Sequence, residues 1–458
     1  IARRQRQMCI RDRSNSGKTL LSLLLISWLK SINKTVQTFK VGPDYLDPQQ
    51  LTAVSKKACR NLDLVLSGES WVKENFNHYG GLTDYSFVEG VMGLFDGIGS
   101  SSKGSTAELA KVLNLPVVLI VDARGKAASL AALIKGFREH DKALKIAGVV
   151  LNNVQTPRHE KILLEVLDQI NIKSLGSLPS CKDLYLPTRH LGLAPAHEIL
   201  DLEIKIKKWA SIAKDHLNIE SFRTLLLSPE SNKKTINLLQ KRESAVIHPI
   251  AIAEDEAFHF RYQETKELLE GNGMPTITWK PLENEQIPKE ARGLIIPGGF
   301  PEQHAHQLSN SKISLNSIKM FSKKFPIYAE CGGMMLLGKS IFDPEGREYS
   351  MAGILPFKAK KGNLKIGYRE ATSKNKSPIT TLGSKLIGHE FHRWEIINER
   401  YNSKINPLWD LKGWNMEIKN EGFCNHLIHA SWIHLHLSLI HISEPTRLRR
   451  ISYAVFCL

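Results

Sequence analysis

The chain has 458 residues, of which 42% are hydrophobic and 24% charged, and it carries a formal net charge of +16. This length favours two or more packed domains, and the composition excludes a disordered protein. The most apolar run, residues 20–29, carries serines and is too short to span a bilayer, so we expect no membrane partner. Six scattered cysteines without a CxxC pair favour a reducing, cytoplasmic location over a disulfide framework or a zinc site.

The two ends of the chain concentrate positive charge. Residues 1–13 contain five Arg and one Asp, and residues 439–458 contain three Arg and one Glu. Neither segment shows helix or strand periodicity, and both resemble translated sequencing-adapter read-through, so we predict that they are foreign to the native protein. The remaining charge is spread over Lys-rich helices and loops with few aromatic residues between them. That pattern predicts a solvated basic surface and no nucleic-acid partner.

Residues 14–202 alternate short apolar runs with longer amphipathic ones. The apolar runs predict buried strands at residues 35–41, 85–94, 116–123 and 146–152. The amphipathic runs predict helices, among them residues 129–140 and 158–169. Strands that are apolar on both faces and separated by helices indicate an α/β domain with a parallel sheet covered on both sides.

The rest of the chain divides into a linker and a second domain. Residues 203–245 are polar and Lys-rich with helical spacing, which predicts a helical tail and linker. Residues 246–438 alternate again, with strand-like runs in PIAIAED, TITWKP, RGLIIPGGF, FPIYAE, GYREAT and GHEFHRWEI. We therefore predict a second α/β domain in this region.

A phosphate-binding loop is predicted at the start of the first domain, in Ser16, Gly17, Lys18 and Thr19. A glycine there lets backbone N–H groups turn toward phosphates, the lysine reaches the β- and γ-phosphate oxygens, and the threonine hydroxyl ligates magnesium. The strand and the first glycine expected before this loop fall within residues 1–13, where Asp12 stands at the glycine position. The motif is therefore incomplete.

Acidic residues follow three of the predicted strands. Asp44 and Asp47 lie in a Pro/Gly-rich turn, where they predict metal and substrate contacts, although turn-forming aspartates are the competing interpretation. Glu89 ends the next strand as a Walker-B acid does and is expected to hold magnesium together with Thr19 and Asp47. Asp96 follows in the same glycine-rich segment. Asp122 ends a third strand, and three such clusters beside a phosphate loop favour catalysis.

A nucleophile is predicted at Cys331, in a segment that reads strand, sharp turn and helix. Small residues after the cysteine permit a strained elbow that exposes the sulfur and favours the thiolate. Cysteines are otherwise usually buried apolar residues, which is the interpretation for Cys59, Cys181 and Cys424.

Two further elements support a nucleophilic site. Gly298 and Gly299 end another strand, and their N–H groups, with that of Gly332 after the cysteine, are candidates for an oxyanion hole. His434 offers an imidazole base near the end of the chain. His436 would share its face of a strand, but the absence of a nearby CxxC pair or acidic third ligand disfavours a metal site. The glutamate of many glutaminase triads follows two residues after the histidine, where this chain has His436, so a Cys–His dyad or a triad completed elsewhere is left open.

In order and combination, the motifs resemble those of cobyrinic acid a,c-diamide synthases: SGKT, KVGPDYLDP, VEGVMGLFDG, IVDARG, IAGVVLNNV, IPGGFPE, AECGGMM, GHEFH and SWIHLH. The resemblance covers most of residues 14–438. It implies a dethiobiotin-synthetase-like P-loop domain fused to a class I glutamine amidotransferase domain. It also implies that Asp44, Asp47, Glu89 and Asp96 handle nucleotide, metal or corrinoid, without dividing these tasks among them.

The implied reaction is amidation of the a- and c-carboxylates of cobyrinic acid with ATP, Mg²⁺ and glutamine. A carboxylate is a poor electrophile, so phosphoryl transfer from ATP first makes an acyl phosphate, with Lys18 and Mg²⁺ offsetting the developing charge. Cys331, deprotonated by His434, attacks the glutamine amide to give a thioester and ammonia. Ammonia then displaces phosphate from the activated carboxyl group.

Alternative functions are left open at this point. Hydrogenobyrinic acid or nickel-sirohydrochlorin is an alternative substrate, and cobyric acid synthase is an alternative enzyme, although its phosphate loop lacks the SGKT present here. A partitioning-type ATPase switch is a different class. It would explain the phosphate loop and the charge but not Cys331, the glycine pair or His434.

Overall fold

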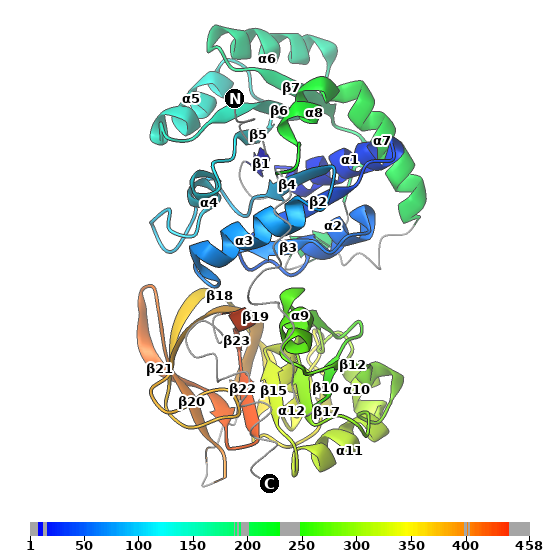
Figure 1. Cartoon of the computed structure of the whole chain (residues 1–458), viewed down its shortest axis with the longest axis vertical. Helices are drawn as coiled ribbons and strands as arrows, with labels where there is room; N and C mark the ends of the chain where they lie inside the picture. Colours follow the sequence, from blue (N-terminus) through cyan, green and yellow to red (C-terminus); the bar gives the residue numbers. More distant parts are fainter. Residues whose placement is uncertain are drawn as a thin grey trace. The chain divides into compact units, whose positions relative to one another are not determined.

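The computed structural model describes residues 8–11, 16–186, 188–189, 192–193, 201–229, 248–397, 401 and 404–438. The chain divides into two compact units, Ile1–Ile236 and Asn237–Leu458 (Figure 1). The predicted foreign segment at residues 439–458 lies outside the described residues. In the described part of the chain, no helix is both long and apolar enough to cross a membrane.

The first unit is built on a seven-stranded parallel sheet with the strand order β3-β2-β4-β1-β5-β6-β7. Its strands are β1 (Met8–Arg11), β2 (Val36–Val41), β3 (Arg60–Leu62), β4 (Tyr85–Glu89), β5 (Val117–Asp122), β6 (Ile146–Val154) and β7 (Ser174–Pro179). Its helices are α1 (Lys18–Ser31), α2 (Asp47–Ser55), α3 (Gly68–Gly80), α4 (Thr106–Val112), α5 (Ser129–His140), α6 (Pro157–Gln169), α7 (Leu202–His216) and α8 (Ile219–Leu225). The order reverses at β1, and ligands of such sheets bind at the carboxyl ends of the strands near that point.

Helices cover both faces of this sheet, as the sequence pattern predicts. One buried cluster joins the strands to α3, α4, α5 and α6, and a second joins them to α1, α2, α7 and α8. Strand β5 shows the reason, because all six of its residues are buried and successive side chains enter opposite clusters, Leu119 in the first and Ile120 in the second. The apolar runs are therefore central strands of a two-sided parallel sheet.

The first strand of the sheet lies within residues 1–13. Met8–Arg11 pairs in parallel with both β4 and β5, with Cys9 opposite Val88 on one side and Val117 on the other. These four residues occupy the place of the strand that precedes the phosphate loop, although residues 1–13 lack the strand periodicity that would indicate it. Asp12 lies outside the described residues, and the foreign origin of the segment stays a prediction.

Element boundaries follow the predicted ones with one notable difference. Helix α5 has the predicted bounds, and α6 begins one residue earlier than predicted. The strand predicted at residues 85–94 ends instead at Glu89, because the chain turns away into a glycine-rich loop at Gly90. That early end leaves Glu89 at the carboxyl edge of the sheet, where a ligand-binding acid is expected.

The second unit has a mixed sheet whose first part is parallel. Strands β12, β10, β13, β15 and β22 lie side by side in that order, all in parallel. Their bounds are β10 (Ile250–Ala253), β12 (Thr276–Trp279), β13 (Gly293–Ile296), β15 (Ile327–Glu330) and β22 (Ile428–Ser431). The helices are α9 (Glu264–Gly271), α10 (Ala305–Asn310), α11 (Lys312–Phe321) and α12 (Gly332–Leu337). A short antiparallel pair, β11 (Phe258–Phe260) and β14 (Gly298–Gly299), lies outside this sheet.

This sheet has a largely antiparallel extension. The extension comprises β16 (Ser340–Phe342), β17 (Glu348–Ser350), β18 (Lys358–Ser373), β19 (Lys385–Ile397), β20 (Asn406–Gly413), β21 (Met416–Cys424) and β23 (Ile433–His434). It includes the strand-like runs GYREAT in β18 and GHEFHRWEI in β19, although the sequence did not predict an antiparallel arrangement. Strand β19 joins the long hairpin partner β18 to the two-residue strand β23, with His389 opposite His434. The pairing ends at His434, so the prediction that a strand carries both His434 and His436 is wrong.

Candidate active sites

The phosphate loop of the first unit has the backbone geometry that its sequence predicts. Gly17 has a φ of 106°, and a Cβ at this position would lie 2.3 Å from the side-chain nitrogen of Asn152. The same Asn152 amide donates to the carbonyl of Ser16 at 2.7 Å, which fixes the loop against β6. Helix α1 begins at Lys18, whose ammonium donates to the carbonyl of Met92 at 3.3 Å. A residue with a side chain could not replace Gly17 without moving the loop.

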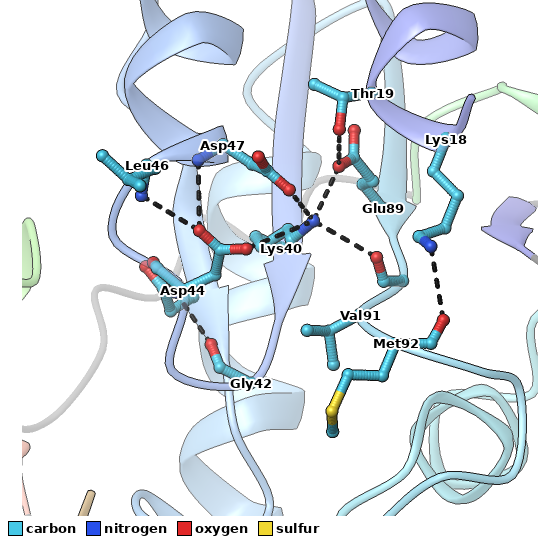
Figure 2. Close-up of polar contacts among 12 residues, drawn as sticks. Lys18, Thr19, Lys40, Gly42, Asp44, Leu46, Asp47, Glu89, Val91 and Met92 are labelled. Atoms are coloured by element: carbon cyan, nitrogen blue, oxygen red, sulfur yellow. Dashed lines mark hydrogen bonds and ion pairs between the residues drawn. The ribbon is translucent and has the colours of Figure 1, made fainter. Parts of the chain in front are cut away.

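The predicted acids Asp44, Asp47 and Glu89 meet around one buried cation, Lys40 (Figure 2). The Lys40 ammonium lies 2.5 Å from Asp47, 2.7 Å from Glu89 and 3.6 Å from Asp44, and its side chain is 1% exposed. Thr19 donates from its hydroxyl to the same oxygen of Glu89 at 2.8 Å. Residues from the ends of β2 and β4, the turn after β2 and the first turn of α1 therefore form a single cluster.

Opposite charges set the protonation of this cluster. Burial acts to lower the pKa of Lys40, but the carboxylates of Asp47, Glu89 and Asp44 outweigh it and raise that pKa well above its usual value. Burial and the neighbouring Asp47 charge raise the pKa of Asp44 to about 7. For Asp47, the Lys40 ammonium overcomes the effect of burial and lowers the pKa. The two aspartates thus differ in their ease of ionisation despite lying in one turn.

The cluster leaves one carboxylate oxygen fit for a metal ion. Oε1 of Glu89 accepts from Lys40 and Thr19, whereas its fully buried Oε2 has no hydrogen-bond partner among the described residues. A buried carboxylate oxygen without a donor suits a cation. The described residues hold no group of three His, Cys, Asp or Glu side chains able to bind a metal without further ligands. Magnesium at Thr19 and Glu89 would therefore need phosphate oxygens or water, as nucleotide-bound magnesium does.

The remaining predicted acids lie apart from this cluster. Asp96 accepts from the backbone N–H of Gly93 at 2.6 Å and so closes the loop that carries Met92, the residue contacted by Lys18. Asp122 forms a two-oxygen ion pair with Arg124. Burial acts to raise the pKa of Asp122, but hydrogen bonds from Arg124 and Asn153 lower it to about 2. The Asp122 carboxylate is therefore already bound by Arg124 and Asn153.

Cys331 occupies a strained turn between β15 and α12 in the second unit. Its φ of 48° and ψ of −109° are unusual for a residue with a side chain. The backbone N–H of Cys331 donates to Ser431 on the neighbouring strand β22 at 2.7 Å. A Cβ on Gly333 would lie 2.0 Å from the carbonyl of Ile296, so the helix after the turn packs directly on β13. This is the strand–turn–helix elbow that the sequence predicts.

The predicted exposure of the sulfur is wrong. Cys331 is 5% exposed, and its thiol donates weakly to the carbonyl of Phe391 on β19 at 3.7 Å. Burial, followed by the charge of Glu302, raises the pKa of this thiol, so the ligand-free site favours the thiol over the thiolate. Among the other cysteines, Cys59 and Cys424 are buried as predicted, whereas Cys181 is exposed.

His434 lies beside a carboxylate that the sequence analysis did not select. Oε2 of Glu330, the residue before Cys331, is 3.3 Å from Nδ1 of His434. The other oxygen of Glu330 accepts from the backbone N–H of Leu435 at 2.9 Å and from the hydroxyl of Tyr328. The carboxylate is therefore held in place next to both predicted catalytic residues.

The predicted oxyanion glycines lie near His434 and the Cys331 turn. A Cβ on Gly298 would lie 2.5 Å from Cε1 and 3.4 Å from Nε2 of His434, so the imidazole packs edge-on against this glycine. A Cβ on Gly332 would lie 3.1 Å from the backbone nitrogen of Gly299. Gly298 thus lies against the His434 ring, and Gly299 lies close to Gly332, the residue after Cys331. His436 has its Nδ1 2.5 Å from the hydroxyl of Ser438.

Sequence reasoning missed Lys40 and Glu330, the residues that join the predicted site residues to one another. Each stood in a quoted motif, Lys40 at the start of KVGPDYLDP and Glu330 within AECGGMM. The available signal was a charged residue inside an apolar strand, because such a residue is almost never fully buried without a partner.

The two sites define a class of protein. One unit is a parallel-sheet nucleotide-binding domain with a phosphate loop, and the other carries a cysteine elbow with an adjacent histidine and glycine pair, as in glutamine amidotransferases. Two family models match accordingly. The CobQ/CobB/MinD/ParA nucleotide-binding domain matches residues 8–193, and the CobB/CobQ-like glutamine amidotransferase domain matches residues 249–439.

Curated relatives make the assignment more specific. A cobyrinate a,c-diamide synthase from a Synechococcus strain is 38% identical, with 93% of each chain covered. A cobyrinate a,c-diamide synthase from Caldanaerobacter subterraneus is 39% identical, again with 93% of each covered. A hydrogenobyrinate a,c-diamide synthase from Mycobacterium tuberculosis is 34% identical over 92% of this chain and 93% of the relative. The chain belongs to the family of cobyrinate a,c-diamide synthases.

Proposed function

We propose that the protein uses ATP and glutamine to amidate the a- and c-carboxylates of cobyrinic acid in cobalamin biosynthesis. The relatives named above support the reaction and the substrate class. The structural observation that carries the proposal is the pair of sites. A phosphate loop with an acid cluster lies in one unit, and Cys331 beside His434 and Glu330 lies in the other.

In the glutaminase half-reaction, the Cys331 sulfur attacks the side-chain amide carbon of glutamine. His434 takes the thiol proton and delivers it to the departing nitrogen, which leaves as ammonia while a thioester forms. We assign stabilisation of the negative oxygen of the tetrahedral intermediate to the backbone N–H groups of Gly298, Gly299 and Gly332, and the close approach of Gly299 to Gly332 supports this. Water then hydrolyses the thioester to glutamate and the free thiol. Because the nucleophile is a thiol, the proposal includes a reducing, cytoplasmic location.

In the synthetase half-reaction, a substrate carboxylate oxygen attacks the γ-phosphorus of ATP, and ADP leaves. Lys18 is placed to offset charge on the phosphates. Thr19 and Glu89 would hold magnesium, with Asp47 nearby, and magnesium when bound supplies Lewis-acid stabilisation of phosphate charge. Lys40 keeps Asp44 and Asp47 from repelling the nucleotide.

Ammonia attacks the acyl carbon and phosphate leaves, which gives the amide. We assign Asp44 and Asp96 to handling of substrate or nucleotide. The position of Asp44 at the edge of the Lys40 cluster supports its assignment. The assignment of Asp96 is supported by its hydrogen bond within the loop that Lys18 contacts.

A second substrate has a specific observation in its favour. The Mycobacterium tuberculosis relative is named for hydrogenobyrinate, which lacks the cobalt of cobyrinate. The metal-free acid is therefore the alternative to test beside the cobalt form.

The test is mass spectrometry of cobyrinic and hydrogenobyrinic acids after incubation with ATP, Mg²⁺ and either glutamine or ammonium chloride. We expect two amidations with either nitrogen donor, and chelation of Mg²⁺ should stop both. The Cys331→Ser variant should lose the glutamine-driven reaction and keep the ammonium-driven one. Failure of the unaltered protein to amidate either acid with either donor would contradict the proposal.

A further inference from the structure

A second carboxyl group, that of Glu302, lies near the Cys331 elbow. It follows Pro301, and a Cβ added to Gly332 would lie 2.7 Å from Cδ of Pro301. The segment that carries Glu302 therefore packs against the residue next to the nucleophile. After burial itself, the charge of Glu302 is the largest influence that raises the pKa of the Cys331 thiol, ahead of that of Glu330. The Glu302 carboxyl and the thiol are thus electrostatic neighbours.

Glu302 differs from the buried Glu390 because it has no cation beside it among the described residues. Its residue is 6% exposed, and it forms no ion pair with any residue that the structure describes. By contrast, the Glu390 carboxylate pairs with Arg369 at 2.6 Å.

The environment of Glu302 therefore opposes its ionisation. Burial raises the pKa of Glu302 to about 8, and its own backbone N–H is the group that acts against this. A buried carboxyl without a counter-ion is costly to ionise, and an arriving cation relieves that cost.

We infer that Glu302 binds the α-ammonium group of the amino acid whose side-chain amide Cys331 attacks. The inference rests on the proposed glutaminase reaction. Glutamine brings one cationic group, which a buried carboxylate without a partner suits, and Glu302 lies on the segment that also supplies the oxyanion glycines Gly298 and Gly299. Two carboxylates near the nucleophile then have separate tasks. Glu330 is held by protein donors and faces the histidine, whereas Glu302 is left for the substrate.

This arrangement has two consequences for the reaction. A site with a buried carboxylate accepts an amide that carries an ammonium group and rejects one that lacks it, because the unpaired carboxylate would remain buried. The bound ammonium group also offsets the negative charge that opposes ionisation of Cys331. The thiolate is therefore favoured when the correct amino acid is present.

The experiment compares glutamine with glutaramate, which is glutamine without its α-amino group. We expect the full-length protein to hydrolyse glutamine with a kcat/KM higher by on the order of 100-fold or more. In Glu302→Gln this preference should shrink by at least about 10-fold, through a loss with glutamine and little change with glutaramate. Glu302→Asp keeps the negative charge and should retain most of the preference. Equal use of both amides by the unaltered protein, or an unchanged preference in Glu302→Gln, would overturn the inference.

Two controls separate this inference from the proposed function. Glu290→Gln changes an exposed glutamate of the same unit and should leave the preference unchanged. Ammonium-driven amidation does not use Cys331, so it should proceed normally in every Glu302 variant. Its absence from the unaltered protein would count against the proposed function, whereas its presence with an unchanged preference would count against Glu302 alone.

Discussion

Oε2 of Glu330 lies 3.3 Å from Nδ1 of His434, and Glu330 directly precedes the nucleophile Cys331 in the chain. A carboxylate at Nδ1 favours the proton on that nitrogen, so that Nε2 is the nitrogen able to accept one. The Cε1–Nε2 edge of the same ring lies against Gly298. The imidazole is thus contacted on both sides, and under the proposed reaction Glu330 is the residue that positions His434.

Glu330→Gln should remove most of the glutaminase activity without unfolding the protein. The amide keeps the shape of the carboxylate but presents a donor to Nδ1, so the proton moves to Nε2 and the base is lost. By analogy with the serine-protease aspartate, kcat should fall about 10³- to 10⁴-fold. Steady-state glutamine hydrolysis measures this.

Ammonium-driven amidation should be unchanged in Glu330→Gln, and so should the pH profile of that reaction. Glu370→Gln, which changes an exposed residue of β18, provides the matched control. Retention of full glutaminase activity in Glu330→Gln would show that the carboxylate does not orient His434.

Gly298→Ala should also impair glutamine hydrolysis, through steric contact. The new Cβ would lie 2.5 Å from Cε1 of His434, which forces the ring to move. Because displacement of a catalytic group by about 1 Å can cost about 10²-fold in rate, we expect a loss of that size in kcat. Gly136→Ala, on helix α5 where the new Cβ meets no atom within 4 Å, serves as the control. A rate equal to that of the unaltered protein would contradict the contact.

Lys40→Met should destabilise the nucleotide-binding unit. Removal of the ammonium group leaves the buried Glu89 and the half-buried Asp47 without their counter-charge. Breaking a buried ion pair in this way costs about 3–5 kcal/mol of unfolding free energy. Calorimetric melting should show a lower transition temperature, and amidation should fall with both nitrogen donors. As a control, Lys34→Met removes an exposed ion pair with Asp84 and should change the melting temperature little. Equal changes in melting temperature for the two variants would contradict the larger contribution of the buried pair.

The pH dependence of stability should differ between the unaltered protein and Glu302→Gln. The pKa of Glu302 is raised from 4.5 to about 8 by burial, so between these values the folded state binds more protons than the unfolded state. Its stabilising contribution is complete below pH 4.5 and is lost as the pH rises through 8. Relative to the unaltered protein, Glu302→Gln should gain up to about 1.4 kcal/mol of unfolding free energy per pH unit across this window. Parallel stability curves, measured by thermal unfolding without glutamine, would contradict the raised pKa.

Local sequence patterns were sufficient to predict much of the fold and to select most of the residues that lie at the two candidate sites. Strand β5 was predictable because a parallel strand buried on both faces is apolar throughout. Gly17 and Cys331 were predictable because a phosphate loop and a nucleophile elbow each need small residues at fixed spacing.

Contacts between distant residues were not predictable in this way. Lys40 and Glu89 are 49 positions apart, and Glu330 and Leu435 are 105 apart, so no short motif shows that they meet. The burial of Cys331 was not predictable for the same reason. Its thiol is covered by Phe391 on β19, a strand that was not predicted to pair beside the site.

Because β23 has only two residues, the orientation of His434 depends on the number of residues that precede it as well as on its identity. His434 faces the site because its partner in the ladder is His389, and side chains along a strand alternate between faces. A single residue inserted between β22 and β23, or within β19 ahead of His389, would turn the imidazole away from Glu330. Insertions and deletions among natural members of the family should therefore collect outside these short stretches. The number of residues between β22 and His434 is thus expected to matter as much as the identity of His434 itself.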